Sequence, residues 1–212
     1  MGPYRGEMNS YAFDRLIDEY HERLPGLGRA QLNDAGVASS VIDRHRIGWD
    51  GQHFIVPIVG TRGHVTCFER WCPEELGVPA DPPIVLLWNR ATLEDQGEEP
   101  VVWVEGILEA LIAESAGLRA LAATGDGRAF NRREWAPLLK GVPVVVAMPK
   151  GDLASRRKYV PSRHRIREIL KLHVPQSEIV EWPENYQRHD GVSRFFVREG
   201  RSREDFFNLP RA

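Results

Sequence analysis

The stretch VVWVEGILEALIAESAG, residues 101–117, organises the second half of the chain. Residues 101–104 are apolar without interruption, which is typical of a strand in a parallel sheet that is covered on both faces. Gly106 follows as the turn, and residues 107–116 predict a helix. The strand therefore delivers Glu105 to its carboxyl end, which is the end where open α/β sheets bind ligands.

Strand-like and helix-like segments continue to alternate after this stretch. The predicted strands are residues 120–123, 142–148 and 178–182, and the predicted helices are residues 134–139, 153–173, 192–199 and 203–208. This alternation predicts an α/β domain over residues 99–212, with a mostly parallel sheet flanked by helices and followed by a helical tail.

The first half of the chain predicts a smaller α+β lobe over residues 1–98. Residues 11–24 place apolar side chains on one helical stripe, and Pro25-Gly26 ends that helix. Two apolar runs, residues 53–59 and 64–69, flank a glycine-bounded turn and predict a β-hairpin. The other predicted elements are helices at residues 28–35, 41–45 and 90–97, and a strand at residues 84–88.

The composition limits the class of protein. The chain has 212 residues, with 28 basic and 30 acidic side chains and a net charge of -2. This length is ample for a core, and the charge argues against a histone-like nucleic-acid binder while allowing a local basic patch. Two cysteines, Cys67 and Cys72, are too few for a disulfide framework. With His53 and His64 they form a candidate zinc site, but the strand predicted at residues 64–69 would orient these side chains poorly for a metal ion. Neither a membrane span nor a secretory signal is visible, so we expect a cytoplasmic protein.

Two carboxylates are candidates for chemistry at the edge of the sheet. Glu105 ends the strand at residues 101–104, and Asp152 follows the strand at residues 142–148. If these strands are neighbours, both side chains face one crevice, where two hard oxygen ligands can hold Mg²⁺ together with waters and phosphates. The alternatives are a solvated glutamate at a strand end and an aspartate that only caps the next helix.

A basic segment follows Asp152. Its cations are Arg156, Arg157, Lys158, Arg163, Arg165, Arg167 and Lys171, and Glu168 is the acid among them. Such an excess on a net negative chain predicts a surface that faces phosphates, and a solvated helix face is the alternative. Arg62 and Arg70, in and beside the predicted hairpin, add two further cations.

From about residue 30 to residue 208, the chain resembles the catalytic core of bacterial (DnaG-type) DNA primases. HFIVPIVGTRGHVTCFERW, residues 53–71, is similar to that family's N-terminal core lobe, in which an apolar-Pro-Ile run and a glycine turn recur. The residues in matching places are Pro57, Ile58, Arg62, Gly63, Phe68 and Arg70.

The second half carries the rest of the resemblance. Residues 86–111 are similar to the approach into the family's TOPRIM fold, with Glu105-Gly106 on its Glu-Gly pair and Glu109 where the primases usually carry an Asp. Residues 179–209 are similar to its closing strand, acidic loop and Gly-Arg helix. The resemblance thus implies a TOPRIM-type sheet preceded by a primase-like lobe.

The chain departs from the family where the third strand ends. The family has an Asp-x-Asp pair there, whereas this chain has Asp152 in the second position and Lys150 in the first, or Pro149 if the match is made without a shift of one residue. A lysine in this place can bind a phosphate directly as a point charge. The loop at His189-Asp190 retains one acid where the family's motif has more.

The resemblance implies a protein of DNA replication that binds single-stranded DNA and nucleoside triphosphates, with a replicative helicase as a partner. It implies nucleotidyl transfer by Glu105, Asp152 and Lys150, with Mg²⁺ or Mn²⁺ at Glu105 and Asp152. The implied nucleic-acid and nucleotide contacts are Arg62, Arg70, Arg156, Arg157, Lys158, Arg163 and Arg165. The alternatives are a catalytically inactive nucleic-acid-binding module and a metal-dependent nuclease.

Overall fold

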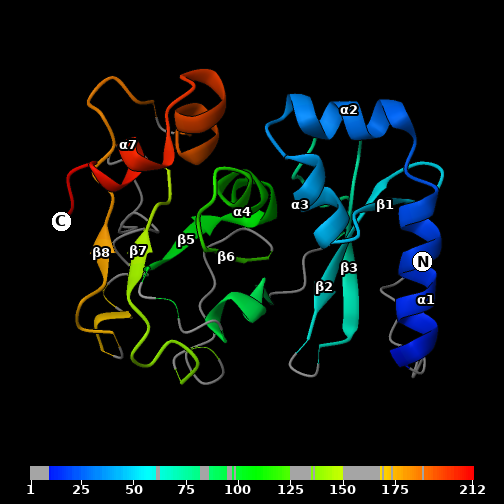
Figure 1. The fold of residues 1–212 in the computed structure, drawn as a ribbon, viewed down its shortest axis with the longest axis horizontal. Coiled ribbons are helices and arrows are strands. Elements are labelled where there is room, and N and C mark those ends of the chain that lie inside the picture. Colours follow the sequence, from blue (N-terminus) through cyan, green and yellow to red (C-terminus); the bar gives the residue numbers. More distant parts are fainter. Residues whose placement is uncertain are drawn as a thin grey trace.

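The computed structural model of the chain describes residues 10–60, 63–81, 86–94, 97, 99–124, 135, 137–149, 168, 170–172, 174–187 and 189–212. Two β-sheets, each with its own helices, build two lobes that lie side by side (Figure 1). No helix in these residues combines the length and the apolar character that crossing a bilayer needs.

The N-terminal lobe holds a three-stranded antiparallel sheet with the order β1-β2-β3. Its elements are α1 (Ser10–Glu22), α2 (Gly26–Asp34), α3 (Ser39–Arg44), β1 (Gly48–Trp49), β2 (Phe54–Val59) and β3 (Val65–Trp71). The predicted hairpin is confirmed as β2 and β3, with Ile58 opposite Cys67. Helix α1 packs on this sheet because its apolar stripe buries Ile17 with Ile55 and Val65.

The second lobe holds a five-stranded sheet with the order β4-β6-β5-β7-β8. Its strands are β4 (Leu87–Trp88), β5 (Val101–Glu105), β6 (Ala120–Ala123), β7 (Val144–Val146) and β8 (Glu178–Ile179). Strands β5 to β8 pair in parallel, and β4 pairs with β6 in the antiparallel sense. The predicted α/β fold with a mostly parallel sheet is confirmed.

Among the described residues, four helical elements accompany this sheet. They are the 3-10 turn η1 (Arg90–Leu93), α4 (Gly106–Ser115), the π-helix η2 (Arg194–Arg198) and α7 (Arg203–Phe207). Helix α4 connects β5 to β6 and packs between the two sheets, as Figure 1 shows. The predicted flanking helices are therefore confirmed at α4 and in the C-terminal tail.

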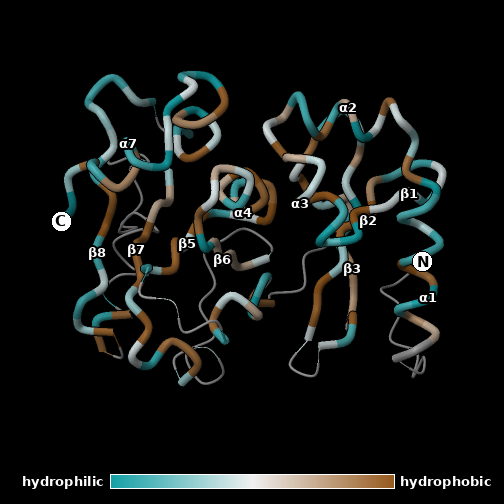
Figure 2. The backbone as a smooth tube through the Cα atoms, in the orientation of Figure 1, coloured by the Kyte–Doolittle hydropathy of each residue, from teal (hydrophilic) through white to brown (hydrophobic). Residues whose placement is uncertain are grey.

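The two lobes share one apolar core. Buried side chains of α2, α3, β2, β5 and α4 belong to the same cluster, and Figure 2 shows hydrophobic segments along the strands of both sheets. The Trp88 indole N–H donates to the Pro57 carbonyl oxygen across the boundary at 3.3 Å. The Ala38 backbone N–H donates to Ser115 Oγ at 2.8 Å. The shared apolar packing and these two hydrogen bonds together fix the position of one lobe relative to the other.

The structure corrects two details of the prediction. Instead of the helix expected at residues 90–97, the described residues form the single turn η1 after Asn89, whose backbone is left-handed with φ of 61°. The Asn89 amide donates to the Ala120 carbonyl oxygen at 2.8 Å, so a tertiary contact overrides a weak local preference. Of the strand expected at residues 84–88, residues 84 and 85 lie outside the described part of the chain, Leu86 is not in the strand, and Leu87–Trp88 forms β4 at the sheet edge.

Candidate site at the carboxyl edge of the parallel sheet

Glu105 is the last residue of β5, the central strand of the five-stranded sheet. Its side chain is partly exposed, whereas the four preceding residues of the strand are buried. The backbone is extended at Glu105, with φ of -90° and ψ of 106°, and then left-handed at Gly106, with φ of 80°. Only glycine adopts this second conformation at little cost, so the Glu-Gly pair turns a strand directly into helix α4.

The end of β7 lies beside Glu105. Strands β5 and β7 are parallel neighbours, with Trp103 opposite Val146. Continued by two residues, this register places Glu105 opposite Met148. The Trp182 indole N–H donates to the Met148 carbonyl oxygen at 2.7 Å and fixes the chain just beyond the strand. The condition for a shared crevice, that the two predicted strands are neighbours, is therefore met.

Most other predicted site residues lie outside the described part of the chain. They are Arg62, Lys150, Asp152, Arg156, Arg157, Lys158, Arg163 and Arg165. The described stretch that contains β7 ends at Pro149, directly before Lys150. Their assignment to the site therefore remains a prediction from the sequence.

Glu109 lies one turn into α4 and joins three segments at this edge. Its Oε2 accepts a hydrogen bond from the Ser193 backbone N–H at 3.0 Å. A Cβ atom built on Gly191 would lie 3.5 Å from this oxygen and 3.5 Å from Pro149 Cγ, so the three segments are in close contact. Burial raises the pKa of Glu109 above its usual value, although the N–H groups of Ser193 and Val192 act in the opposite direction.

Asp190 belongs to the closing segment, by which we mean residues 181–187 and 189–201. Its side chain is only 12% exposed and lies 2.5 Å from Nη1 of Arg194. Burial raises the pKa of Asp190, but the Gln187 backbone N–H and the Arg194 guanidinium outweigh it and hold the pKa below its usual value. Asp190 is therefore an ionised carboxylate with a cationic partner.

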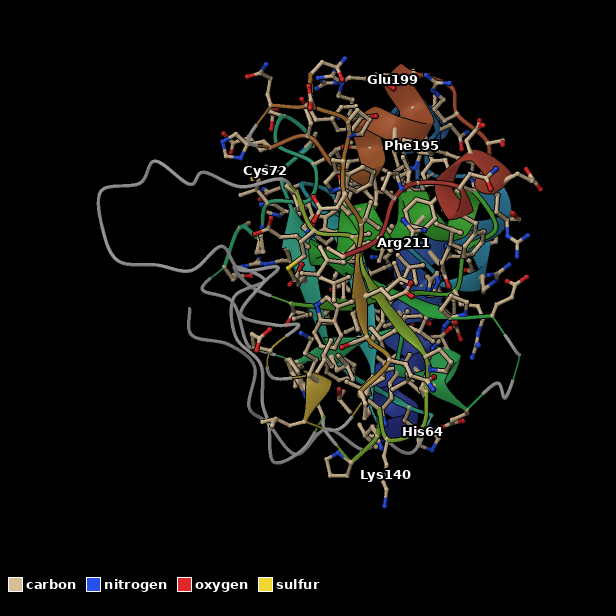
Figure 3. The ribbon with its side chains drawn as sticks, turned by 90° about the vertical axis from the view of Figure 1, so that its left-hand side faces the viewer. His64, Cys72, Lys140, Phe195, Glu199 and Arg211 are labelled. Carbon is tan, nitrogen blue, oxygen red and sulfur yellow. The ribbon has the colours of Figure 1, made fainter. Side chains whose placement is uncertain are left out.

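The same guanidinium contacts a second acid and an aromatic ring. Arg194 Nε lies 3.0 Å from Oε1 of Glu199, and its guanidinium carbon lies 4.3 Å from the centre of the Tyr186 ring. Figure 3 shows Glu199 at the top of the molecule, with Phe195 below it on the same helical turn. Sequence reasoning missed the role of Arg194. The signal was the spacing of four residues between Asp190, just before the helix predicted at residues 192–199, and Arg194 within that helix.

Arg70 is the predicted nucleic-acid contact that the structure describes. It lies on β3 and forms a two-pronged ion pair with Asp81, with distances of 2.7 Å from Nε to Oδ2 and 2.6 Å from Nη2 to Oδ1. The guanidinium holds the pKa of the Asp81 carboxyl below its usual value. A phosphate at Arg70 would therefore compete with Asp81, so this residue is a weaker contact than its charge suggests.

The alternative zinc site receives no support from the described residues. Among them, no three His, Cys, Asp or Glu side chains gather so that they could hold a metal ion. His64 and Cys72 precede and follow the seven residues of β3, and Figure 3 shows them at opposite ends of the molecule. His64 Nδ1 lies 3.0 Å from Asp14 Oδ2 instead. Burial raises the pKa of the Cys67 thiol to about 11, so it stays protonated at neutral pH.

No family model and no curated protein matches the chain. Its structure, however, is similar to solved bacterial primases. One holds the zinc-binding and RNA polymerase domains of the Aquifex aeolicus primase, with a TM-score of 0.65 and 15% identity, covering 97% of this chain and 63% of that one. The E. coli primase catalytic core has a TM-score of 0.62 and 16% identity, covering 95% of this chain and 80% of that one.

A third similar structure is a DnaG primase catalytic domain bound to single-stranded DNA. Its TM-score is 0.66 and its identity 16%, covering 90% of this chain and 74% of that one. The chain thus has the fold of the DnaG-type primase catalytic core, as the sequence resemblance predicts, and it spans less than two thirds of the Aquifex aeolicus structure. At these identities the likeness concerns the fold, and the activity has to be argued from the site.

Proposed function

We propose that this chain is a primase-like TOPRIM protein of DNA replication that binds single-stranded DNA and nucleotides at the carboxyl edge of its five-stranded sheet. One observation carries the proposal: a fold that matches primase catalytic cores over both lobes ends its central strand in Glu105-Gly106. Parallel sheets bind ligands at this edge. A replication role is consistent with a cytoplasmic protein and with a helicase partner.

The basic segment supplies the cations of the proposed interface. The interface cations that follow β7 in the sequence are Arg156, Arg157, Lys158, Arg163 and Arg165. In the other lobe, Arg62 lies between β2 and β3 in the sequence, and Arg70 lies on β3. Side chains of this kind bind phosphates through charge and bidentate hydrogen bonds. Each phosphate contact releases counterions from the nucleic acid, so the affinity should fall steeply as salt concentration rises.

Charge reversal tests the binding proposal. We expect the triple variant Arg156→Glu, Arg157→Glu, Arg163→Glu to bind a labelled single-stranded oligonucleotide more weakly in fluorescence anisotropy. The magnitude of the negative slope of log affinity against log salt concentration should decrease by about 2, because three phosphate contacts to a single strand contribute about 0.7 each. The control is Arg15→Glu on α1, where the side chain is 84% exposed. Equal affinities of the triple variant and the wild type would contradict the proposal.

Primer synthesis is the second candidate, and Glu105 favours it. We propose that Glu105 and Asp152 would hold Mg²⁺ or Mn²⁺, whose chemistry is to neutralise charge on the transferring phosphoryl group. Of the two proposed ligands, the described residues include Glu105, at the end of β5, whereas Asp152 lies outside them. They do not by themselves make a metal site, and Lys150 would bind a phosphate directly.

An activity assay separates the remaining candidates. The protein is incubated with nucleoside triphosphates and a single-stranded template, in Mg²⁺ and separately in Mn²⁺, and compared with Glu105→Gln. A primer that the variant does not make supports nucleotidyl transfer. Binding without a product in either metal identifies a catalytically inactive binding module. Cleavage of plasmid DNA that requires Glu105 identifies a nuclease.

A further inference from the structure

We infer that Arg194 is the resident cation of the closing segment and that it prevents Asp190 from taking a divalent metal ion. The inference rests on the proposed function only for the importance of this edge, because it states that one acid there, Asp190, is not available to a metal ion. It makes Arg194 a residue that determines cation specificity and positions the closing segment, without contact to substrate.

The guanidinium lies among oxygen atoms from three places in the closing segment. Nη1 lies 2.5 Å from Asp190 Oδ2 and 3.4 Å from the Asn185 carbonyl oxygen, and Nε lies 3.0 Å from Glu199 Oε1. Carboxylate and carbonyl oxygens are also the ligands that Mg²⁺ and Ca²⁺ prefer. The arginine therefore holds the place that a hard cation would need in order to reach both carboxylates.

The carboxylates of this cluster are neutralised without a metal ion, because arginines outnumber them. Asp190 and Glu199 carry two negative charges, and Arg194 and Arg201 carry two positive charges, with Arg201 Nε 3.7 Å from Glu199 Oε2. Arg198 is a third cation, close enough to help lower the pKa of Asp190. A divalent ion would thus meet no net negative field.

Aromatic stacking holds the guanidinium in position. Arg194 lies over the Tyr186 ring, and Tyr186 stacks on Trp182 with 5.6 Å between ring centres and 9° between planes. Burial and the nearby Glu199 raise the pKa of Tyr186, so its ring stays neutral. Trp182 is in turn hydrogen-bonded to Met148 at the end of β7. The Arg194 side chain is 22% exposed, so an incoming ion would have to displace a shielded and stacked cation.

Mn²⁺ binding measured by electron paramagnetic resonance tests the inference. We expect Asp190→Asn to leave the number of Mn²⁺ ions bound by the wild type unchanged. We expect Arg194→Gln to bind one additional Mn²⁺ per chain, and the double variant Arg194→Gln, Asp190→Asn to lose it. Arg194→Lys, which keeps the positive charge, is the matched control and should gain no ion.

Two results would overturn the inference. One is a loss of Mn²⁺ from the wild type on Asp190→Asn, since Asp190 would then be a ligand despite Arg194. The other is an Arg194→Gln protein that has the circular dichroism spectrum of the wild type and gains no ion. If Arg194→Gln fails to fold even in Mn²⁺, the Asp190→Asn comparison decides alone.

The same titrations separate this inference from the proposed function. Glu105→Gln should remove any Mn²⁺ that the wild type binds at the end of β5, and it should leave the additional ion of Arg194→Gln in place. A wild type that binds no Mn²⁺ would contradict the metal-dependent part of the proposed function. It would agree with the role inferred for Arg194.

Discussion

The beginning of α4 and the closing segment lie at the same edge of the sheet, and both carry shielded acids. Their pKa values move in opposite directions: that of Glu109 is above its usual value, and that of Asp190 is below it. At Glu109 burial raises the pKa more than the backbone N–H groups of Ser193 and Val192 lower it, whereas at Asp190 the Gln187 N–H and the Arg194 guanidinium outweigh burial. The charge state of a carboxylate at this edge is therefore set by the balance between its burial and the donors around it.

The most damaging single change on the closing-segment side is Trp182→Ala. The side chain is 5% exposed, stacks on Tyr186 and donates to the Met148 carbonyl oxygen, so its removal leaves a cavity and an unpaired acceptor. We expect a loss of about 3–5 kcal/mol in the free energy of unfolding, measured by urea denaturation. Trp182→Phe is the control and should cost less, because it keeps part of the packing. A loss below about 1 kcal/mol for Trp182→Ala would mean that the segment is not held by this stack.

Gly106→Ala tests the α4 side of the comparison. An added methyl group meets no atom within 4 Å, so the cost arises from the left-handed backbone alone. We expect a loss of about 1–2 kcal/mol in the free energy of unfolding. Gly26→Ala is the matched control, since the space around Gly26 is also open and its φ is not in the left-handed region. Similar effects at the two glycines would contradict the role assigned to Gly106.

The smallest effects come from neutralising the two acids, and their signs should differ. The lowered pKa of Asp190 contributes stability that is present above the unfolded-state value, about 3.9, and is lost as pH falls through the folded-state value. The raised pKa of Glu109 removes stability as pH rises from the unfolded-state value, about 4.3, through the folded-state value. Each acid thus has its own pH window.

The measurement is the free energy of unfolding of Asp190→Asn, Glu109→Gln and the wild type from about pH 3 to about pH 7. Relative to the wild type, Asp190→Asn should be most destabilised at the neutral end and approach the wild type in acid. Glu109→Gln should gain stability relative to the wild type as pH rises. Parallel curves for all three proteins would remove the contrast between the two regions.

The elements that the sequence predicts well are those with a strong local pattern. The apolar run Val-Val-Trp-Val before Glu105-Gly106 specifies a buried parallel strand and its turn, and the runs around Gly60 and Gly63 specify the hairpin. The adjacency of β5 and β7, stated as a condition in the sequence analysis, is confirmed by the pairing. These features follow from periodicity and from glycine conformation.

Features that depend on tertiary partners are harder to predict from the sequence. The antiparallel pairing of Leu87 with Ala123 at the sheet edge has no signature in the sequence, because a short apolar run does not reveal its neighbour. The state of Asp190 could not be derived from its match to an acidic loop, since it depends on where Arg194 and Asn185 come to lie. The division of the chain at residue 98 remains a proposal, and β4, which precedes residue 98, pairs with β6 in the sheet of the second lobe.

The contacts between the lobes also bear on how the protein unfolds. Glu114 on α4, whose side chain is 8% exposed, accepts from Asn89 at 2.6 Å and is hydrogen-bonded to His45 of the other lobe. The His45 ring lies 4.5 Å from the ring of Trp88. Each lobe alone would expose the side chains that are buried in this interface. Heat should therefore unfold both lobes together, in one cooperative calorimetric transition. Cutting the gene between the lobes should therefore yield two fragments prone to aggregation, which co-expression would rescue.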